Sequence, residues 1–201
     1  FDKIALPYDY YTDFDIKNRH IYIESSRGCP FTCEFCLSSI DSSMRYLPID
    51  VFLNEIDKLW NRGARNYKFI DRTFNLKISY AKAILEYFLT KDEDYFLHFE
   101  VIPDNFPPEL RELLKKFKAG SLQLEVGIQT LNLDVAKNIN RNLKIDKIKE
   151  NLEFLSSETN AHMHIDLIVG LPSETIDSFA QNLNLLYTLS SGEIQIGILK
   201  K

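Results

Sequence analysis

The sequence predicts an α/β fold, a partial (β/α)6 barrel in which parallel strands alternate with helices. Short strand-like runs are separated by segments whose apolar residues recur at helical spacing. Such alternation is typical of a parallel sheet with right-handed crossovers. The runs are apolar on one face and polar on the other, whereas a sheet covered by helices on both sides needs two apolar faces. This favours a curved barrel around a polar lumen over an open, doubly wound sheet.

Six runs read as strands because they are short and rich in β-branched and aromatic residues. They are residues 20–24, 66–71, 95–101, 121–128, 162–169 and 193–199. Four apolar stripes between them predict helices, at residues 52–60, 78–89, 110–117 and 176–186. The first stripe follows Pro48 and ends at Gly63, the third is ended by Gly120, and Ser173 is the predicted N-cap of the last.

The polar faces are clearest in the later strands. Residues i and i+2 of a strand point the same way, so His162, His164 and Asp166 share one face. Gln123 and Glu125 share the corresponding face one strand earlier. Burying unpaired polar groups costs about 1–3 kcal/mol each, so we expect these groups to face a wet or ligand-filled lumen. The alternative is a set of core residues that bond to one another.

Composition and charge limit the classes of partner. The chain has 201 residues, 45% of them hydrophobic and 26% charged, enough for one large domain or two small ones. The net charge is −5 and no basic stripe is present, so nucleic acid is not favoured. No apolar run reaches the roughly 18 residues that span a bilayer, and no secretory signal is visible, so no membrane partner is expected.

The ends of the chain predict a piece of a longer protein. It begins at Phe1 instead of a methionine and stops at Lys201, directly after a strand-like run. Residues 1–19 contain Pro7 and three tyrosines, lack periodicity, and read as a lead-in segment or interdomain linker. Residues 20–201 read as the core domain. We therefore expect flanking domains of the same protein among its partners.

All three cysteines lie close together, as Cys29, Cys33 and Cys36 in C-x3-C-x2-C spacing. A disulfide framework needs an even number spread along the chain, so the group indicates a metal site in a reducing compartment, read as the cytoplasm. Iron–sulfur clusters are usually held by four thiolates, and three leave one iron with an open position for chemistry. A structural zinc site would need a fourth ligand.

At this motif the sequence resembles the radical S-adenosylmethionine (SAM) superfamily, whose three-cysteine motif follows the first strand. An aromatic residue precedes the last cysteine, here Phe35. The resemblance covers residues 20–201 and implies a TIM-barrel-like partial barrel with a [4Fe-4S] cluster at its mouth. It also implies that SAM chelates the unique iron. An electron from an external flavodoxin- or ferredoxin-type donor then splits SAM into methionine and a 5′-deoxyadenosyl radical, which abstracts hydrogen from an unidentified substrate.

Further segments resemble the coproporphyrinogen-dehydrogenase-like branch of this superfamily. They are His-Phe-Glu at 98–100, Leu-Glu-Val-Gly-Ile-Gln at 124–129, Asn-Arg at 140–141 and Asp-Leu-Ile-Val-Gly-Leu-Pro at 166–172. By this resemblance Glu100, Gln129, Arg141 and Asp166 bind SAM together with Phe35. A carboxylate can accept hydrogen bonds from the ribose hydroxyls or the amino group of SAM, and an arginine can donate two parallel hydrogen bonds to the methionine carboxylate. Taken alone, Arg141 also reads as a solvated helix-end residue, and Asp166 as a strand-end cap.

One superfamily motif is missing. Many members carry Gly-Gly-Glu after the second strand to bind the SAM amine, and residues 71–75 here read Asp-Arg-Thr-Phe-Asn. Asp71, Thr73 or a nearby backbone carbonyl is expected to accept from the ammonium instead. Arg72 reads as a substrate-contacting or structural residue. His98, His162 and His164 read as hydrogen-bonded structural groups or neighbours of the SAM pocket, more often than as catalytic residues.

The segments around Cys29, Arg72 and Glu100 resemble radical SAM proteins with an N-terminal cobalamin-binding domain and a C-terminal region of unknown function. That resemblance implies cobalamin bound by a further domain, because no Asp-x-His-x-x-Gly run is present, and methyl transfer to an unactivated carbon or phosphorus. The alternatives are a coproporphyrinogen-dehydrogenase-like oxidase, a methylthiotransferase-like tRNA modifier, which the acidic balance disfavours, and a non-catalytic zinc-binding module.

Overall fold

The computed structural model describes residues 5–200, and its centre is one sheet of six parallel strands. Neighbouring strands in the sheet follow the order of the chain. They are β1 (Ile21–Ile23), β4 (Asn66–Phe69), β5 (Phe96–Val101), β6 (Leu122–Gln129), β7 (His162–Val169) and β8 (Glu193–Ile198). Each of the six predicted runs forms one of these strands, so the prediction of a parallel sheet is confirmed.

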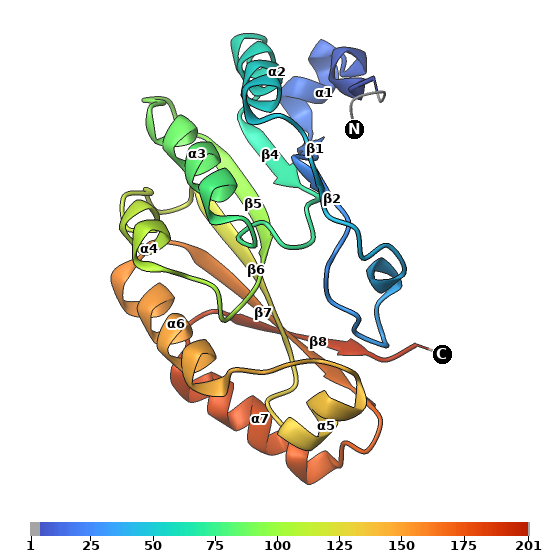
Figure 1. Ribbon diagram of the computed structural model, residues 1–201. Helices are drawn as coiled ribbons and strands as arrows, with labels where there is room; N and C mark the ends of the chain where they lie inside the picture. The colour runs from blue at the N-terminus through green and yellow to red at the C-terminus, as the bar shows by residue number, and fades with distance from the viewer. Residues whose placement is uncertain (1–4, 201) are drawn as a thin grey trace.

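The helices that cover the sheet lie along one side of it, and the cysteine-bearing loop lies on the other (Figure 1). This is the cover of a barrel wall, not of an open sheet buried on both faces, and it confirms the partial barrel. The covering helices are α2 (Ile49–Asn61), α3 (Ile78–Leu89), α4 (Pro108–Leu114), α6 (Ile145–Glu158) and α7 (Ile176–Leu189). Two short helices lie apart from them, α1 (Asp13–Asn18) before β1 and α5 (Leu133–Asn138) after β6, and the 3₁₀ turns are η1 (Pro7–Tyr10) and η2 (Leu37–Ile40). None of these helices, within residues 5–200, is long and apolar enough to cross a membrane.

The predicted N-cap of α7 is wrong by two residues. Thr175 holds that position, and its Oγ1 accepts a hydrogen bond from Ser178 N at 3.1 Å. Ser173 has a φ of 68°, whereas an N-cap residue is extended. The backbone after β7 therefore makes a tight turn before the helix begins.

Burial alternates along β6 and β7, as the sequence predicts. Outward-facing residues such as Val126 and Ile165 are fully buried beneath the helices. Inward-facing residues such as Glu125 and Asp166 are partly exposed. The apolar core therefore lies between the sheet and the helices, and the inner face of the sheet lines a polar lumen.

The described residues before β1 pack against the barrel. Tyr8 is 3% exposed, and its hydroxyl donates to Glu24 O at 3.2 Å and accepts from Glu24 N at 2.9 Å. Ile16 of α1 joins the same core. The assignment of residues 1–19 to a lead-in segment or linker stays a prediction, and residues 1–4 lie outside the described part of the chain.

Candidate cofactor-binding site

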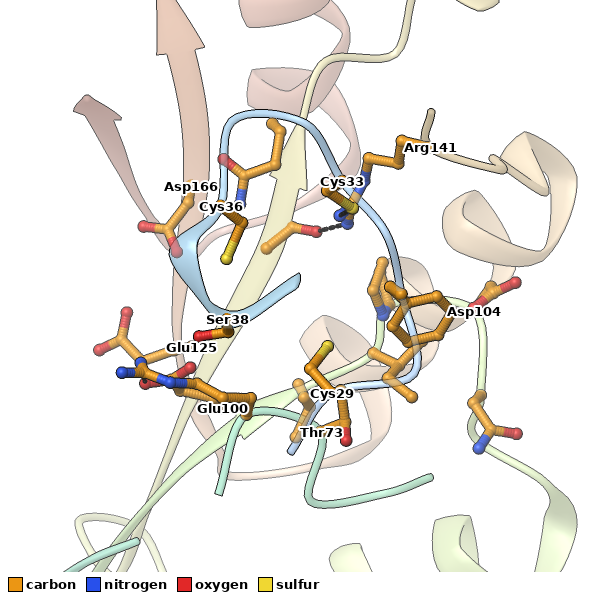
Figure 2. Close-up of a pocket in the computed structure, with 18 of the residues that line it drawn as sticks. Cys29, Cys33, Cys36, Ser38, Thr73, Glu100, Asp104, Glu125, Arg141 and Asp166 are labelled. Carbon is orange, nitrogen blue, oxygen red and sulfur yellow. Dashed lines mark hydrogen bonds and ion pairs between the residues drawn. The ribbon is translucent and has the colours of Figure 1, made fainter. Parts of the chain in front are cut away.

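A cavity of about 900 Å³ lies between the carboxyl-terminal part of the sheet and the cysteine loop (Figure 2). Every cysteine and every SAM-binding residue carried over from the superfamily motifs lines it, although these residues are spread over much of the chain. They are Cys29, Cys33, Phe35, Cys36, Glu100, Gln129, Arg141 and Asp166. The fold therefore brings the complete predicted set to one place.

A buried carboxylate fixes the start of the cysteine loop. Asp71 follows β4, is 1% exposed, and accepts hydrogen bonds from Ser25 N at 3.0 Å, Ser25 Oγ at 2.5 Å and Ser26 Oγ at 2.6 Å. Burial raises the pKa of Asp71, and the hydrogen bonds from the two serines oppose that rise. Both oxygens of Asp71 are occupied, so it positions the loop and is not a free acceptor for a SAM ammonium.

Gly28 makes the turn into the cysteine motif. Its φ is +99°, and a Cβ at this position would lie 2.1 Å from Ser43 O. Next to the turn, Cys29 N donates to Asp41 O at 3.1 Å. The short antiparallel strands β2 (Ser26–Arg27) and β3 (Arg45–Tyr46) join the two ends of the loop. Only glycine combines this backbone conformation with so close an approach.

The far side of the cysteine loop is tied to the segment that follows α5. Glu34 N donates to Ile139 O at 3.1 Å, and Asn140 Nδ2 donates to Thr32 Oγ1 at 2.6 Å. Phe35 packs against a small apolar cluster that includes Ile139. The loop is thus held at both ends, independently of any bound group.

The three thiols face a common space. Figure 2 shows Cys29, Cys33 and Cys36 turned into the cavity from different sides, and all three are free thiols. Burial raises the pKa of the Cys29 thiol, so a metal that binds there must release a proton. Arg141 Nη1 lies 3.7 Å from Cys33 Sγ, which places a positive charge beside the sulfur when it becomes a thiolate.

These thiols are spread more widely than the ligands of one zinc ion. With Zn–S bonds of about 2.3 Å, tetrahedral geometry puts two sulfurs about 3.8 Å apart. Among residues 5–200, the one group of histidine, cysteine, aspartate and glutamate donors close enough to hold a single ion lies elsewhere, on β7 and β8. Three separated thiols therefore fit the corners of an iron–sulfur cluster better than a closed zinc site.

Three carboxylates line the inner face of β5, β6 and β7. Burial raises the pKa of Asp166 to about 6, and the nearby Glu125 and Glu100 carboxylates add to the rise. Glu100 accepts a hydrogen bond from Arg72 Nη1 at 2.8 Å. Burial would raise the pKa of Glu125, but hydrogen bonds, first of all from His98, lower it overall. Of the three, Asp166 is the carboxyl group without a paired cation.

Three buried polar atoms beside the cavity lack a hydrogen-bond partner in the described chain: Thr73 Oγ1, Arg141 Nε and His98 Nδ1. Thr73 is 4% exposed and lies where many superfamily members carry the Gly-Gly-Glu contact. Arg141 donates through Nη2 to Gly127 O, which leaves Nε unused. Because unpaired buried groups cost about 1–3 kcal/mol each, this end of the barrel fits a polar ligand with both positive and negative groups, as SAM has.

Sequence reasoning missed the residues that hold the loop in place. The bond between Ser25 and Asp71 spans 46 positions, and the bond between Thr32 and Asn140 spans 108. No local pattern marks such contacts. The glycine directly before the first cysteine is the one signal that could have pointed to the constrained turn at Gly28.

The protein-family model described as the Radical SAM superfamily matches residues 23–186. The chain belongs to the radical SAM superfamily. This radical SAM chain is 23% identical over 180 residues to the ribosomal protein uS12 methylthiotransferase RimO of a Nitratiruptor species, covering 84% of this chain and 41% of RimO. It is 25% identical over 190 residues to TokK, a cobalamin-dependent radical SAM methyltransferase of Streptomyces tokunonensis, covering 88% of this chain and 27% of TokK.

The radical SAM fold is also seen in a solved structure of the methyltransferase TsrM from Kitasatospora setae with cobalamin and a [4Fe-4S] cluster bound. The TM-score is 0.78 at 16% sequence identity, covering 92% of this chain and 38% of TsrM. The chain spans less than half the length of the two curated relatives. Membership confirms the prediction of a radical SAM enzyme core, and it implies a [4Fe-4S] cluster and SAM as cofactors.

Proposed function

We propose that this core binds a [4Fe-4S] cluster through Cys29, Cys33 and Cys36 and cleaves SAM reductively to methionine and a 5′-deoxyadenosyl radical. The observation that carries the proposal is the set of three thiols, not four, facing one large cavity that charged side chains also line. When bound, the cluster supplies the electron that cleaves the sulfonium. An external donor of the flavodoxin or ferredoxin type would replace that electron, and the free thiols support a cytoplasmic location.

The methionine half of SAM is assigned to the side of the cavity nearest Cys33. Arg141 carries a fixed positive charge there, and its unpaired Nε supports a role as donor to the methionine carboxylate. Thr73 Oγ1 is buried without a partner, which supports its use as an acceptor for the SAM ammonium in place of the Gly-Gly-Glu contact. Neither group has to move far to meet a ligand, since both already lie at the cavity wall.

The nucleoside half is assigned to the inner ends of the later strands. Asp166 has no paired cation and can accept from the ribose hydroxyls, and Glu100 can do the same from β5. Gln129 ends β6 with a φ of 70°, at an irregularity in the pairing of β6 with β7. Phe35 offers an aromatic face beside it on the cysteine loop. Together these groups would orient the adenosine and exclude water from it.

The test is reductive SAM cleavage by the reconstituted protein. The chain is loaded anaerobically with iron and sulfide, SAM and dithionite are added, and the products are separated by chromatography. We expect about four irons per chain and equal amounts of methionine and 5′-deoxyadenosine. A fully loaded protein that binds SAM but forms neither product contradicts the proposal.

For the longer protein we propose cobalamin-dependent methyl transfer to a substrate that is not yet identified. The similarity to TokK supports it, as does the fold shared with the cobalamin-bound TsrM structure. The test is S-adenosylhomocysteine formation by the full-length protein with and without added cobalamin. Formation that requires cobalamin supports methyl transfer, whereas formation without it favours the methylthiotransferase alternative that the similarity to RimO supports.

A further inference from the structure

A second group of metal-ligand side chains lies at the amino-terminal ends of β7 and β8, away from the cysteines. The strand pairing creates it: His164 lies opposite Glu193 of β8 on one side and opposite Glu125 of β6 on the other. His162 precedes His164 by two residues and shares its inward face. The residues therefore meet because the register of three strands aligns them.

The donor atoms of this group are spaced like the ligands of one metal ion. His162 Nε2 lies 3.0 Å from His164 Nε2. Glu193 Oε1 lies 3.4 Å from His162 Nε2, and Glu193 Oε2 lies 3.4 Å from His164 Nε2. Donors about 2.0–2.1 Å from a tetrahedral zinc ion lie about 3.3 Å from one another. Among residues 5–200 this is the one group that meets such a requirement.

A neighbouring carboxylate orients the central ligand. Glu125 Oε1 lies 3.0 Å from His164 Nδ1, and the amide nitrogens of Gln123 and Gln195 lie 3.1 Å and 2.5 Å from the same nitrogen. A carboxylate only accepts, so the Nδ1–H form of His164 donates to Glu125 and has Nε2 available for a metal ion. Carboxylate support of this kind is the usual second layer of a histidine metal site.

The contact between the two histidine nitrogens needs either an N–H proton or a metal ion between them. Two Nε2 atoms that both present lone pairs repel at 3.0 Å, so without a metal ion one of them carries its proton and donates to the other. The side chains of His162 and Glu193 are 47% and 67% exposed, so an ion can reach the group from solvent and both ligands can adjust to it. His164, at 18%, is the fixed member.

We propose that His162, His164 and Glu193 bind one divalent transition-metal ion at the amino-terminal end of the barrel. Two imidazoles and one carboxylate are a donor set that suits zinc and iron(II) and suits magnesium poorly. Water completes the coordination on the exposed side. Because the ligands come from β7 and from β8, the last strand of the described sheet, the ion fastens that strand to its neighbour.

The test is a calorimetric titration of the cluster-loaded protein with zinc chloride under anaerobic conditions, so that the cysteines are already occupied. We expect one zinc ion per chain, and no comparable binding of magnesium. His162→Ala and Glu193→Gln should each weaken zinc binding by more than about tenfold, because loss of even a supporting partner costs 10–100-fold. His20→Ala, which removes the chain's remaining exposed histidine outside the group, should bind zinc like the original protein.

The same titration on the variant C29A/C33A/C36A separates this proposal from the cluster proposal, since its zinc site should persist when SAM cleavage is lost. Zinc should also raise the melting temperature of this variant, because it binds the folded state. Absence of zinc binding by the cluster-loaded protein overturns the proposal. Zinc binding of equal strength in His162→Ala and Glu193→Gln overturns it as well, because the ion then lies elsewhere.

Discussion

The polar side chains at the two ends of the barrel differ in how far they are hydrogen-bonded within the chain. At the carboxyl-terminal end, Thr73 Oγ1 and Arg141 Nε are buried without partners, and Asp166 has a pKa raised to about 6. Towards the amino-terminal end, Glu125 Oε1 receives Gln123 at 2.9 Å and His98 at 2.8 Å. Both sets face the same lumen. The groups bonded to Glu125 have partners in the chain, and among their buried atoms only His98 Nδ1 lacks one in the described residues, whereas Thr73 Oγ1 makes no hydrogen bond there.

This difference distinguishes groups that are available to a ligand from groups that stabilise the chain itself. Hydrogen bonds within the chain offset the free energy that polar groups lose on burial, as for the groups bonded to Glu125. Groups that remain unpaired beside a large cavity, as at the cysteine-lined end, are expected to be stabilised when a ligand binds. Glu125 and His98 also line the cavity, so they form a part of its wall that is bonded within the chain. Substitutions at the two ends should therefore have opposite effects on stability and on cofactor binding.

The largest effect is expected from Cys33→Ala. Two thiolates cannot hold the cluster as three do, so iron content and 5′-deoxyadenosine formation should fall below detection. The circular dichroism spectrum should stay that of the original chain, because the loop is tied by other residues. Ser38→Ala, which changes another side chain of the same cavity, is the matched control and should keep the cluster. Retention of a full cluster by Cys33→Ala would break the assignment.

Gly28→Ala should come next, because a Cβ there would lie 2.1 Å from Ser43 O. Gly63→Ala is a close control: its φ is +100°, but nothing lies within 4 Å of the added carbon. Backbone strain of about 1–3 kcal/mol is common to both variants. We expect only Gly28→Ala to lose most of its iron after reconstitution. Equal iron contents would show that the close contact at Ser43 does not shape the cysteine loop.

A pair of variants tests the contrast between the ends directly. His98→Leu removes the donor 2.8 Å from Glu125 and should lower the free energy of unfolding by about 1–3 kcal/mol. Thr73→Val removes an unpaired hydroxyl, so the cofactor-free chain should be equally stable or slightly more stable. Urea unfolding measures both. Thr73→Val should also weaken SAM binding to the cluster-loaded protein by up to about tenfold, the worth of one hydrogen bond. If Thr73→Val lowered the stability of the chain and left its SAM affinity unchanged, Thr73 would be a structural residue and the proposed difference between the two ends would be contradicted.

The smallest effect is the pH dependence of Asp166→Asn. The folded chain holds the Asp166 proton up to a pKa of about 6, above the ordinary value of 3.8, so ionisation opposes folding as pH rises between these values. The cofactor-free variant should therefore gain stability over the original chain as pH rises from 4, with the full gain above about 6. Water screens the exposed part of the carboxyl, so we expect about 1 kcal/mol, or about 2–4 °C in melting temperature. A melting-temperature difference that is the same at pH 5 and pH 7.5 would contradict the raised pKa.

Periodicity made much of the fold predictable. All six strands and four helices follow from local apolar patterns, as in β6, where every second residue is buried. Three helices escaped prediction: α1 and α5 have only six residues each, and α6 is rich in lysine and glutamate. The site was predictable where residues lie within one motif, as at Cys29 to Cys36. The hydrogen bond from Ser25 to Asp71 and the pairing of His164 with Glu193 depend on how distant strands are aligned, which local sequence does not encode.

The proposal for the carboxyl-terminal end depends on a cluster held by three thiolates with one iron open to SAM. Electron paramagnetic resonance of the reduced, cluster-loaded protein, recorded with SAM carrying an isotopic label on its amino nitrogen, tests this most directly. We expect SAM to change the spectrum and the labelled nitrogen to show hyperfine coupling to the cluster. A complete four-iron cluster whose spectrum is unchanged at saturating SAM would contradict the open position.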